Sequence, residues 1–180
     1  MPQAAAKSVF LVGPMGSGKT AVGRQLAGRL GYRFVDSDAE IERRTGVDIP
    51  YIFEKEGEDG FRVREREVID ELSAGEGIVL GTGGGAILAP DSRERLAARG
   101  VVVYLETSVD QQLGRTRRST NRPLLFTDDP RGRLAELMTV REPLYRSIAA
   151  ITVRTDGRKV RSVVDEIADA LGRMGIGQQE

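Results

Sequence analysis

Residues 8–30 read SVFLVGPMGSGKTAVGRQLAGRL, an apolar run followed by a glycine-rich loop and an amphipathic segment. The loop at 13–20 matches G-x-x-x-x-G-K-[ST], a pattern whose backbone N–H groups surround the phosphates of a nucleotide. Apolar side chains follow at Val22, Leu26 and Leu30, a spacing that predicts a helix with its N-terminus facing the anion. Because strand, loop and helix occur in the order that the motif requires, this stretch predicts phosphate binding and not an ordinary glycine-rich turn.

Composition limits where the protein works and what it binds. The chain has 180 residues, with 27 basic and 27 acidic side chains that cancel, so no overall field attracts nucleic acid or an anionic membrane. It has no cysteine and no histidine, which excludes disulfides, thiol nucleophiles and histidine acid–base chemistry. No apolar run approaches the length of a membrane span, and the N-terminus MPQAAAKSV lacks a signal-like block. We expect one cytoplasmic domain over 1–180, a monomer that binds neither nucleic acid nor membrane.

Short β-rich runs alternate with helical patterns along the whole chain. The runs are 9–12, 33–36, 78–80, 101–105 and 148–153, and helical periodicity occurs at 61–72, 93–99, 111–117 and 160–171. Continuous apolar strands alternating with helices imply a parallel sheet covered on both faces. The sequence therefore predicts a three-layer α/β/α fold with a central five-stranded parallel sheet, with ligands beyond the carboxyl ends of its strands.

Two segments depart from this alternation. Residues 38–75 look helical but contain glycine and proline breaks, which predicts a small helical excursion. Residues 115–133 are polar and rich in arginine, with Pro123 and Pro130, which is typical of a mobile surface loop or lid.

Two carboxylates close the second predicted strand, FVDSD. In an extended segment Asp36 and Asp38 point to the same face. If this strand lies beside the first, one carboxylate can hold the Mg²⁺ shell while the other meets an acceptor hydroxyl. The alternative is that Asp38 merely caps a helix over 39–45. Of the other strand ends, 78–80 leads into glycines and 101–105 into Glu106, so Asp36 is the expected metal-side carboxylate.

Glycines and arginines complete the candidate chemistry. Residues 81–85 read GTGGG, which suits a ligand in contact with backbone, although a plain flexible loop is the alternative. Arg62 and Glu65 share a helix face and, taken alone, are most simply a surface ion pair. Arg141 is a second isolated cation, and two converging guanidinium groups would match a carboxylate. Arg122, inside the predicted lid, could close over a transferring phosphate.

In order and spacing these motifs resemble the shikimate kinase family over about residues 9–171. The segments that carry the resemblance are 13–20, 36–38, 61–65, 81–85, 122–125 and 141–145. The resemblance implies a P-loop kinase with a nucleoside monophosphate kinase-like fold. It also implies transfer of the γ-phosphate of ATP, with Mg²⁺, to the 3-hydroxyl of shikimate, in the route to chorismate and the aromatic amino acids.

The same resemblance implies individual roles, with 38–75 as the substrate-binding helical region and 115–133 as the lid. Glu65 would orient Arg62, and Arg158 would lie near adenine. Catalysis would involve Lys19, Asp38 and Arg122. Shikimate would contact Asp38, Arg62, Gly83, Gly84, Gly85 and Arg141. The nucleotide would contact Gly16, Ser17, Gly18, Lys19, Thr20, Ala21, Arg115, Arg122 and Arg158, and the metal Thr20 and Asp36.

Other functions are compatible with the loop alone. A kinase for gluconate or a nucleoside monophosphate shares the loop and lid but not the paired DSD, the three glycines and the two arginines. A nucleotide-dependent switch is disfavoured because no N-K-x-D guanine signature occurs. A silent sensor domain would be expected to lack a catalytic residue, and none is visibly lost.

Overall fold

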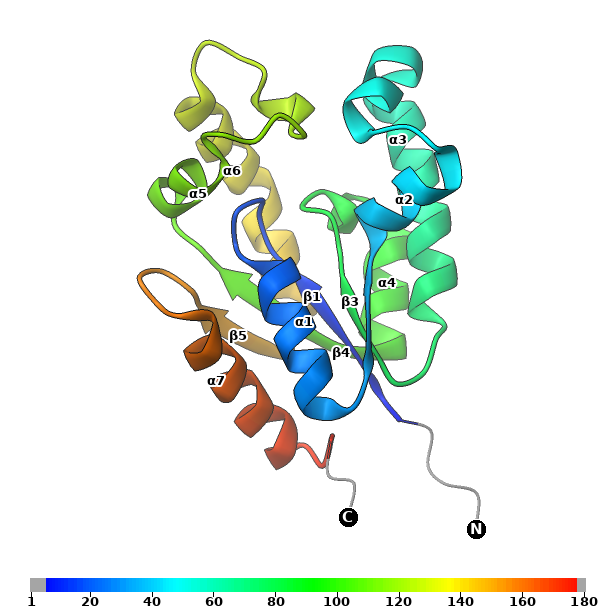
Figure 1. The fold of residues 1–180 in the computed structure, drawn as a ribbon, viewed down its shortest axis with the longest axis vertical. Helices are drawn as coiled ribbons and strands as arrows, with labels where there is room; N and C mark the ends of the chain where they lie inside the picture. Colours follow the sequence, from blue (N-terminus) through cyan, green and yellow to red (C-terminus); the bar gives the residue numbers. More distant parts are fainter. Residues whose placement is uncertain (1–5, 178–180) are drawn as a thin grey trace.

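A five-stranded parallel sheet forms the centre of the computed structural model, which describes residues 6–177 (Figure 1). Its strands are β1 (Ser8–Val12), β2 (Arg33–Asp36), β3 (Ile78–Gly81), β4 (Gly100–Glu106) and β5 (Ile151–Arg154). Their order is β2-β3-β1-β4-β5, which places β1 in the middle. The predicted fold class is therefore confirmed, and every predicted strand is present.

Helices cover both faces of this sheet. They are α1 (Lys19–Leu30), α2 (Ser37–Thr45), α3 (Ile49–Ser73), α4 (Pro90–Arg99), α5 (Val109–Thr116), α6 (Pro130–Ile148) and α7 (Val160–Arg173), with short 3₁₀ turns η1 (Ala86–Leu88) and η2 (Pro123–Leu125). Leu26 of α1 and Ile167 of α7 pack on one face, against Leu11. Leu96 of α4 and Tyr145 of α6 pack on the other, with Phe10. The apolar strands are buried because both faces are covered.

In two details the sheet differs from what the sequence analysis considered: the condition that the second strand lies beside the first is not met, and the predicted start of the last strand is wrong. β2 does not lie beside β1, because β3 pairs with both of them. The last strand begins at Ile151, since residues up to Ile148 continue α6 and only a short link follows. Isoleucine and alanine at 148–150 suit either state, so the apolar run did not locate the boundary.

The predicted helical region, 38–75, corresponds to α2 and α3. Its helices share a small core of their own, made of Ile41, Ile49, Ile52, Phe61 and Val68. Gly57 interrupts α3 with φ 72° and ψ 179°, a conformation that separates the N-terminal turns from the longer C-terminal part. The region therefore stands as a separate arm above the sheet (Figure 1).

The predicted lid, 115–133, connects α5 to α6 through η2. Residues 130–133 belong to α6. Asp129 caps the N-terminus of this helix, because its side chain accepts a hydrogen bond from the Gly132 N–H. The connection faces the α2–α3 arm across the carboxyl ends of the strands (Figure 1). No helix within residues 6–177 combines the length and apolarity needed to cross a bilayer. Most of the N-terminal stretch on which the signal prediction rests, residues 1–5, lies outside the described part.

Candidate active site

The phosphate loop joins β1 to α1 and holds an inward-turned lysine. Gly16 and Gly18 have φ of 76° and 90°, which glycine adopts without strain, and Gly18 is the N-cap of α1. The Lys19 Nζ donates to the carbonyl oxygens of Gly13 at 2.7 Å and Pro14 at 2.8 Å. Burial, followed by the nearby Arg122 cation, lowers the pKa of Lys19 to about 7. An anion placed in the loop would restore the charged form of this side chain.

Thr20 and Asp36 meet at the edge of the same loop, although β2 is two strands from β1. The Thr20 hydroxyl donates to Asp36 Oδ2 at 3.3 Å, while Asp36 Oδ1 accepts from the Ala39 N–H at 2.9 Å. Asp36, not Asp38, is thus the cap of α2, and the alternative interpretation of Asp38 is wrong. One hydroxyl and one carboxylate, completed by phosphate oxygens, are a donor set that suits Mg²⁺. No cluster of three or more acidic side chains that could hold a metal by itself occurs in the described chain.

Asp38 lies in the first turn of α2, so it is helical and does not extend the strand. Its Oδ1 is buried and has no hydrogen-bond partner among residues 6–177. Burial, followed by the neighbouring Glu65 carboxylate, raises the pKa of Asp38 to about 7. The side chain is therefore a carboxylate whose charge is poorly solvated and which lacks a donor.

The glycine segment 81–85 brings the two halves of the site together. Thr82 anchors it, because its hydroxyl donates to the Leu11 carbonyl at 2.8 Å, and the Gly83 N–H donates to the Ser37 hydroxyl at 3.1 Å. A Cβ on Gly83 would lie 2.8 Å from both Asp38 Oδ1 and Glu65 Oε2, so a larger residue would push these acids apart. The loop thus forms the floor of the site, where hydrogen bonds and close packing fix it, and it is not the flexible loop of the alternative interpretation.

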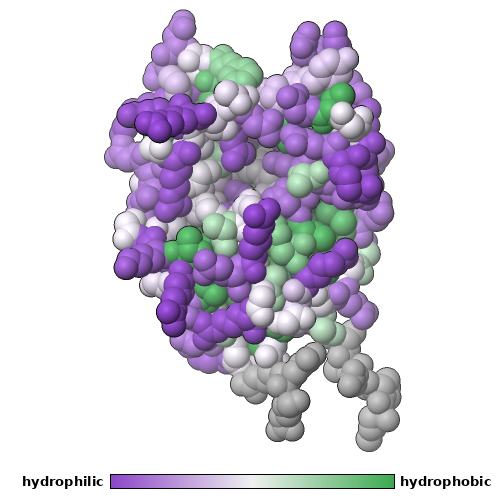
Figure 2. Space-filling view, in the orientation of Figure 1, coloured by the Kyte–Doolittle hydropathy of each residue, from purple (hydrophilic) through white to green (hydrophobic). Residues whose placement is uncertain are grey.

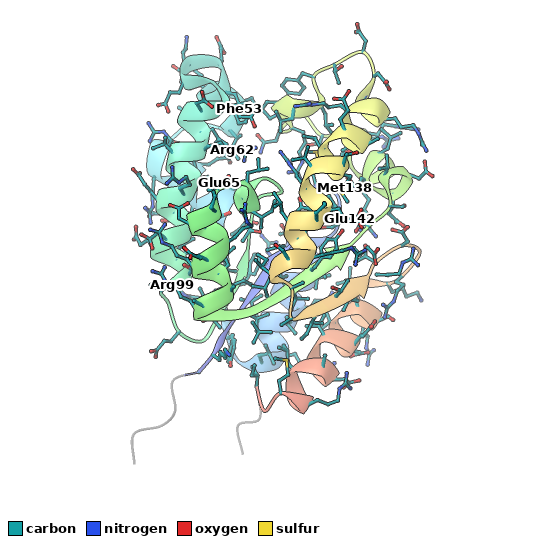
Figure 3. All side chains as sticks on the ribbon, turned by 180° about the vertical axis from the view of Figure 1, so that it is seen from behind. Phe53, Arg62, Glu65, Arg99, Met138 and Glu142 are labelled. Atoms are coloured by element: carbon teal, nitrogen blue, oxygen red, sulfur yellow. The ribbon has the colours of Figure 1, made fainter. Side chains whose placement is uncertain are left out.

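Two arginines approach this floor from α3 and α6. Arg62 Nη1 donates to Glu65 at 2.7 Å, and Glu65 is only 3% exposed, so the surface ion pair of the alternative interpretation is a buried one. Arg141 is 4% exposed, and burial lowers its pKa. Its Nη1 lies 3.4 Å from where a Cβ on Gly84 would be. Arg62 and Glu65 lie on the side of α3 that faces α6 (Figure 3). The two desolvated cations therefore converge on the glycine floor.

Two adjoining cavities result. The first, of about 530 Å³, is lined by the phosphate loop, Asp36, Asp38 and Arg115. The second, of about 50 Å³, is lined by Asp38, Arg62, Glu65 and Arg141 together with apolar side chains. Asp38, Gly83, Gly84, Asn121 and Arg122 line both cavities. Figure 2 shows the surface hollowed between the lid and the α2–α3 arm, with polar residues around the rim. The carboxylates of Asp36 and Asp38, the glycine segment and the phosphate loop therefore line one cavity.

The remaining predicted arginines differ in their placement. Arg122 spans both cavities, with its Nε buried and unpartnered within residues 6–177. Arg115 donates to the Gly16 carbonyl at 2.9 Å and so lies against the phosphate loop. Arg158 does not line either cavity, and its guanidinium binds Ser162 and Glu166 of helix α7. Its predicted adenine contact remains a prediction.

Several wall residues were not predicted. Met15, Phe53 and Phe61 form the apolar side of the second cavity, and in the sequence they are indistinguishable from ordinary core residues. The Tyr145 hydroxyl donates to the Gly84 carbonyl and its ring stacks on Tyr104 with centroids 5.1 Å apart. Its position in the REPLY segment, four residues after Arg141 on the same helix face, was the available signal.

Comparison with known proteins places this geometry in a family. The family model described as shikimate kinase matches residues 15–172. The shikimate kinase of Halorhodospira halophila is 59% identical over 163 residues, 91% of this chain and 92% of the relative. A solved shikimate kinase from Acinetobacter baumannii, in complex with shikimate, is 50% identical with a TM-score of 0.92 over 94% of both chains. A third, from Aquifex aeolicus, is 35% identical with a TM-score of 0.80 over 95% of this chain and 99% of that one. This chain belongs to the shikimate kinase family.

Proposed function

We propose that this kinase transfers the γ-phosphate of ATP, with Mg²⁺, to the 3-hydroxyl of shikimate, giving shikimate 3-phosphate and ADP. The observation that carries the proposal is the sharing of Asp38 and Arg122 between the phosphate-loop cavity and the arginine-lined cavity. A phosphoryl donor in the first cavity and a carboxylated alcohol in the second would meet at these two side chains.

The first cavity would hold the nucleotide. Backbone N–H groups of residues 16–21 and the Lys19 ammonium would bind its phosphates, and Arg115 lies against the same loop. Thr20 and Asp36 would hold Mg²⁺, which when bound would neutralise phosphate charge. Arg122 would add a second cation above the transferring group, where charge stabilisation is worth most because water is excluded.

The second cavity would hold shikimate. Arg62 and Arg141 would bind the carboxylate, and the fixed Glu65 pair holds the Arg62 guanidinium in place. The bare backbone of Gly83, Gly84 and Gly85 would let the ring approach closely. At Gly85 the absence of a side chain also leaves room for Arg62, because a Cβ there would lie 2.4 Å from Arg62 Nη1. A small cavity with two cations and an apolar wall of Phe53 and Phe61 fits a compact carboxylic acid better than a nucleoside or an extended sugar acid.

Asp38 would accept the proton of the reacting hydroxyl. Phosphoryl transfer passes through a loose transition state, so the proton can leave late and a strong base is not required. The raised pKa of Asp38, near 7, makes it a better acceptor than a solvated aspartate at neutral pH. Most of the acceleration would then come from the positioning of both substrates and from Lys19, Arg122 and Mg²⁺.

A coupled assay of ADP release tests the proposal. Shikimate, gluconate and AMP are offered separately as acceptors at equal concentration, with Mg²⁺ and ATP. We expect turnover with shikimate that exceeds turnover with either rival at least about a hundredfold, because only shikimate offers a compact carboxylate to both arginines. Equal or greater turnover with gluconate or AMP would reject the proposed acceptor.

A further inference from the structure

Two exposed aromatic side chains line an unfilled groove outside the acceptor cavity. Phe126, in the lid, is 63% exposed, and Tyr51, in the first turn of α3, is 47% exposed. They line the same groove of about 530 Å³, with Pro50, Phe53 and Pro123. Asp48 and Glu54 complete its lining. Large aromatic rings that line one open groove gain free energy if the groove closes and water leaves.

The lid side of this groove is mechanically tied to Arg122. The turn η2 separates Arg122 from Phe126. In this turn the Leu125 N–H donates to the Arg122 carbonyl at 2.9 Å, and the Phe126 N–H donates to the Pro123 carbonyl at 3.1 Å. A hydrogen-bonded turn moves as a unit, so a displacement of the Phe126 ring is transmitted to the Arg122 backbone.

The arm side of the groove is tied to the acceptor cavity. Phe53 lines both spaces, and its ring lies 5.0 Å from that of Phe61 within the small core of the arm. In Figure 3 Phe53 lies on the same side of α3 as Arg62 and Glu65. A contact made in the outer groove therefore bears directly on the wall of the acceptor cavity.

We propose that Phe126 is a positioning residue, whose ring seats on Pro50, Tyr51 and Phe53 when both substrates are bound and thereby holds Arg122 over the transferring phosphate. The inference rests on the proposed function, which gives Arg122 its role. We call this contact between the Phe126 ring and the α2–α3 arm the latch of the lid.

A double-mutant cycle with Arg122 tests the coupling. Phe126→Ala should lower kcat/KM for shikimate about tenfold, because most of an apolar contact of phenylalanine size is lost. Phe126→Leu should retain most of the activity, since it still fills the groove. In an Arg122→Ala background the Phe126→Ala change should cost less than about twofold, because the residue it positions is gone. Val140→Ala, at a side chain 60% exposed on α6, is the matched surface control and should leave the rate unchanged.

A single tryptophan reports closure independently of turnover. The chain has no tryptophan, so Phe126→Trp introduces a unique fluorophore on the lid. Its emission should move to shorter wavelength when a non-hydrolysable ATP analogue, Mg²⁺ and shikimate are added, and Tyr51→Ala should reduce that shift. An unchanged emission at saturation refutes the latch, as does an equal loss from Phe126→Ala with and without Arg122.

The two proposals fail in different ways. If the wild-type enzyme does not phosphorylate shikimate, the proposed function falls, and the emission response to the nucleotide analogue still decides whether the lid closes on the arm. If the wild type is active and Phe126→Ala matches it, only the latch is wrong.

Discussion

Replacement of Asp38 by asparagine should abolish most of the activity and yet stabilise the substrate-free protein. The Asp38 carboxylate is poorly solvated, has a buried oxygen with no donor within residues 6–177, and faces the Glu65 carboxylate. An asparagine of the same shape carries no charge and can donate to the neighbouring acid. The residue that catalysis needs is thus one that folding disfavours, a conflict common in active sites.

The magnitude follows from the pKa. A rise from 3.8 to about 7 corresponds to about 4 kcal/mol of folding free energy above pH 7. We expect Asp38→Asn to raise the free energy of unfolding by between about 2 and 4 kcal/mol, because the side chain is only partly enclosed and water screens part of the effect. For a domain of this size that range raises Tm by roughly 5 °C or more.

The sign of the pH dependence is specific. The unfolded chain loses the Asp38 proton near pH 4, whereas the folded protein keeps it until about pH 7. The penalty is therefore absent below about pH 4, grows between pH 4 and 7 and is constant above that. The advantage of Asp38→Asn should be full at pH 8 and less than half as large at pH 5.

Urea denaturation followed by circular dichroism at both pH values measures this difference. Asp36→Asn is the matched control, because Asn caps a helix as well as Asp and should leave stability nearly unchanged. An Asp38→Asn protein that is no more stable than wild type at pH 8, or whose advantage does not vary with pH, would show that the Asp38 environment has been misjudged.

Three further results are expected. Arg141→Lys should raise KM for shikimate at least about tenfold in initial-rate assays while KM for ATP changes less than about twofold, because a lysine cannot reproduce the planar guanidinium; an equal effect on both substrates would place Arg141 elsewhere. Gly83→Ala should lower kcat/KM about a hundredfold with an unchanged circular dichroism spectrum, since its Cβ would lie 2.8 Å from both Asp38 and Glu65; retention of activity would show that the acids can move. Removal of divalent metal with EDTA should abolish turnover, and Thr20→Ala should raise the Mg²⁺ concentration for half-maximal rate at least about fivefold; a metal-independent rate would exclude the proposed Mg²⁺ site.

Most of the fold could be predicted from the sequence, because the patterns that indicate strands and helices are local. Five apolar runs and the periodic segments between them were enough to predict the layers and the parallel sheet. Strand order was not local: β3 inserts between β1 and β2, and nothing in the run 33–36 distinguishes an edge strand paired with β3 from one paired with β1. The geometry still brings Asp36 to Thr20, because helix α1 projects over β3 toward β2.

Side-chain roles were predictable where the residue type is unusual for its setting. Three glycines after a buried strand marked the site, whereas the roles of the arginines came from the family resemblance and not from their own surroundings in the sequence. The apolar wall was not predictable, because Phe53 and Phe61 have the residue type and spacing of core residues. The capping role of Asp36 was also hidden, since helix α2 begins at Ser37, two residues earlier than the helix over 39–45 that the sequence suggested.

Lys19 and Asp38, whose pKa values both lie near 7, have opposite charge, and this decides how substrates should bind. Burial lowers the pKa of Lys19 to about 7, so its charged form is disfavoured above that pH, and burial raises the pKa of Asp38 to about 7, so its charged form is disfavoured below that pH. Neither ion is therefore well solvated in the empty cleft at neutral pH. Phosphate oxygens would compensate the first and a hydroxyl donor the second. Each ligand therefore gains more binding free energy here than at a solvated site of the same composition, because without the ligand the site holds a buried, poorly compensated charge.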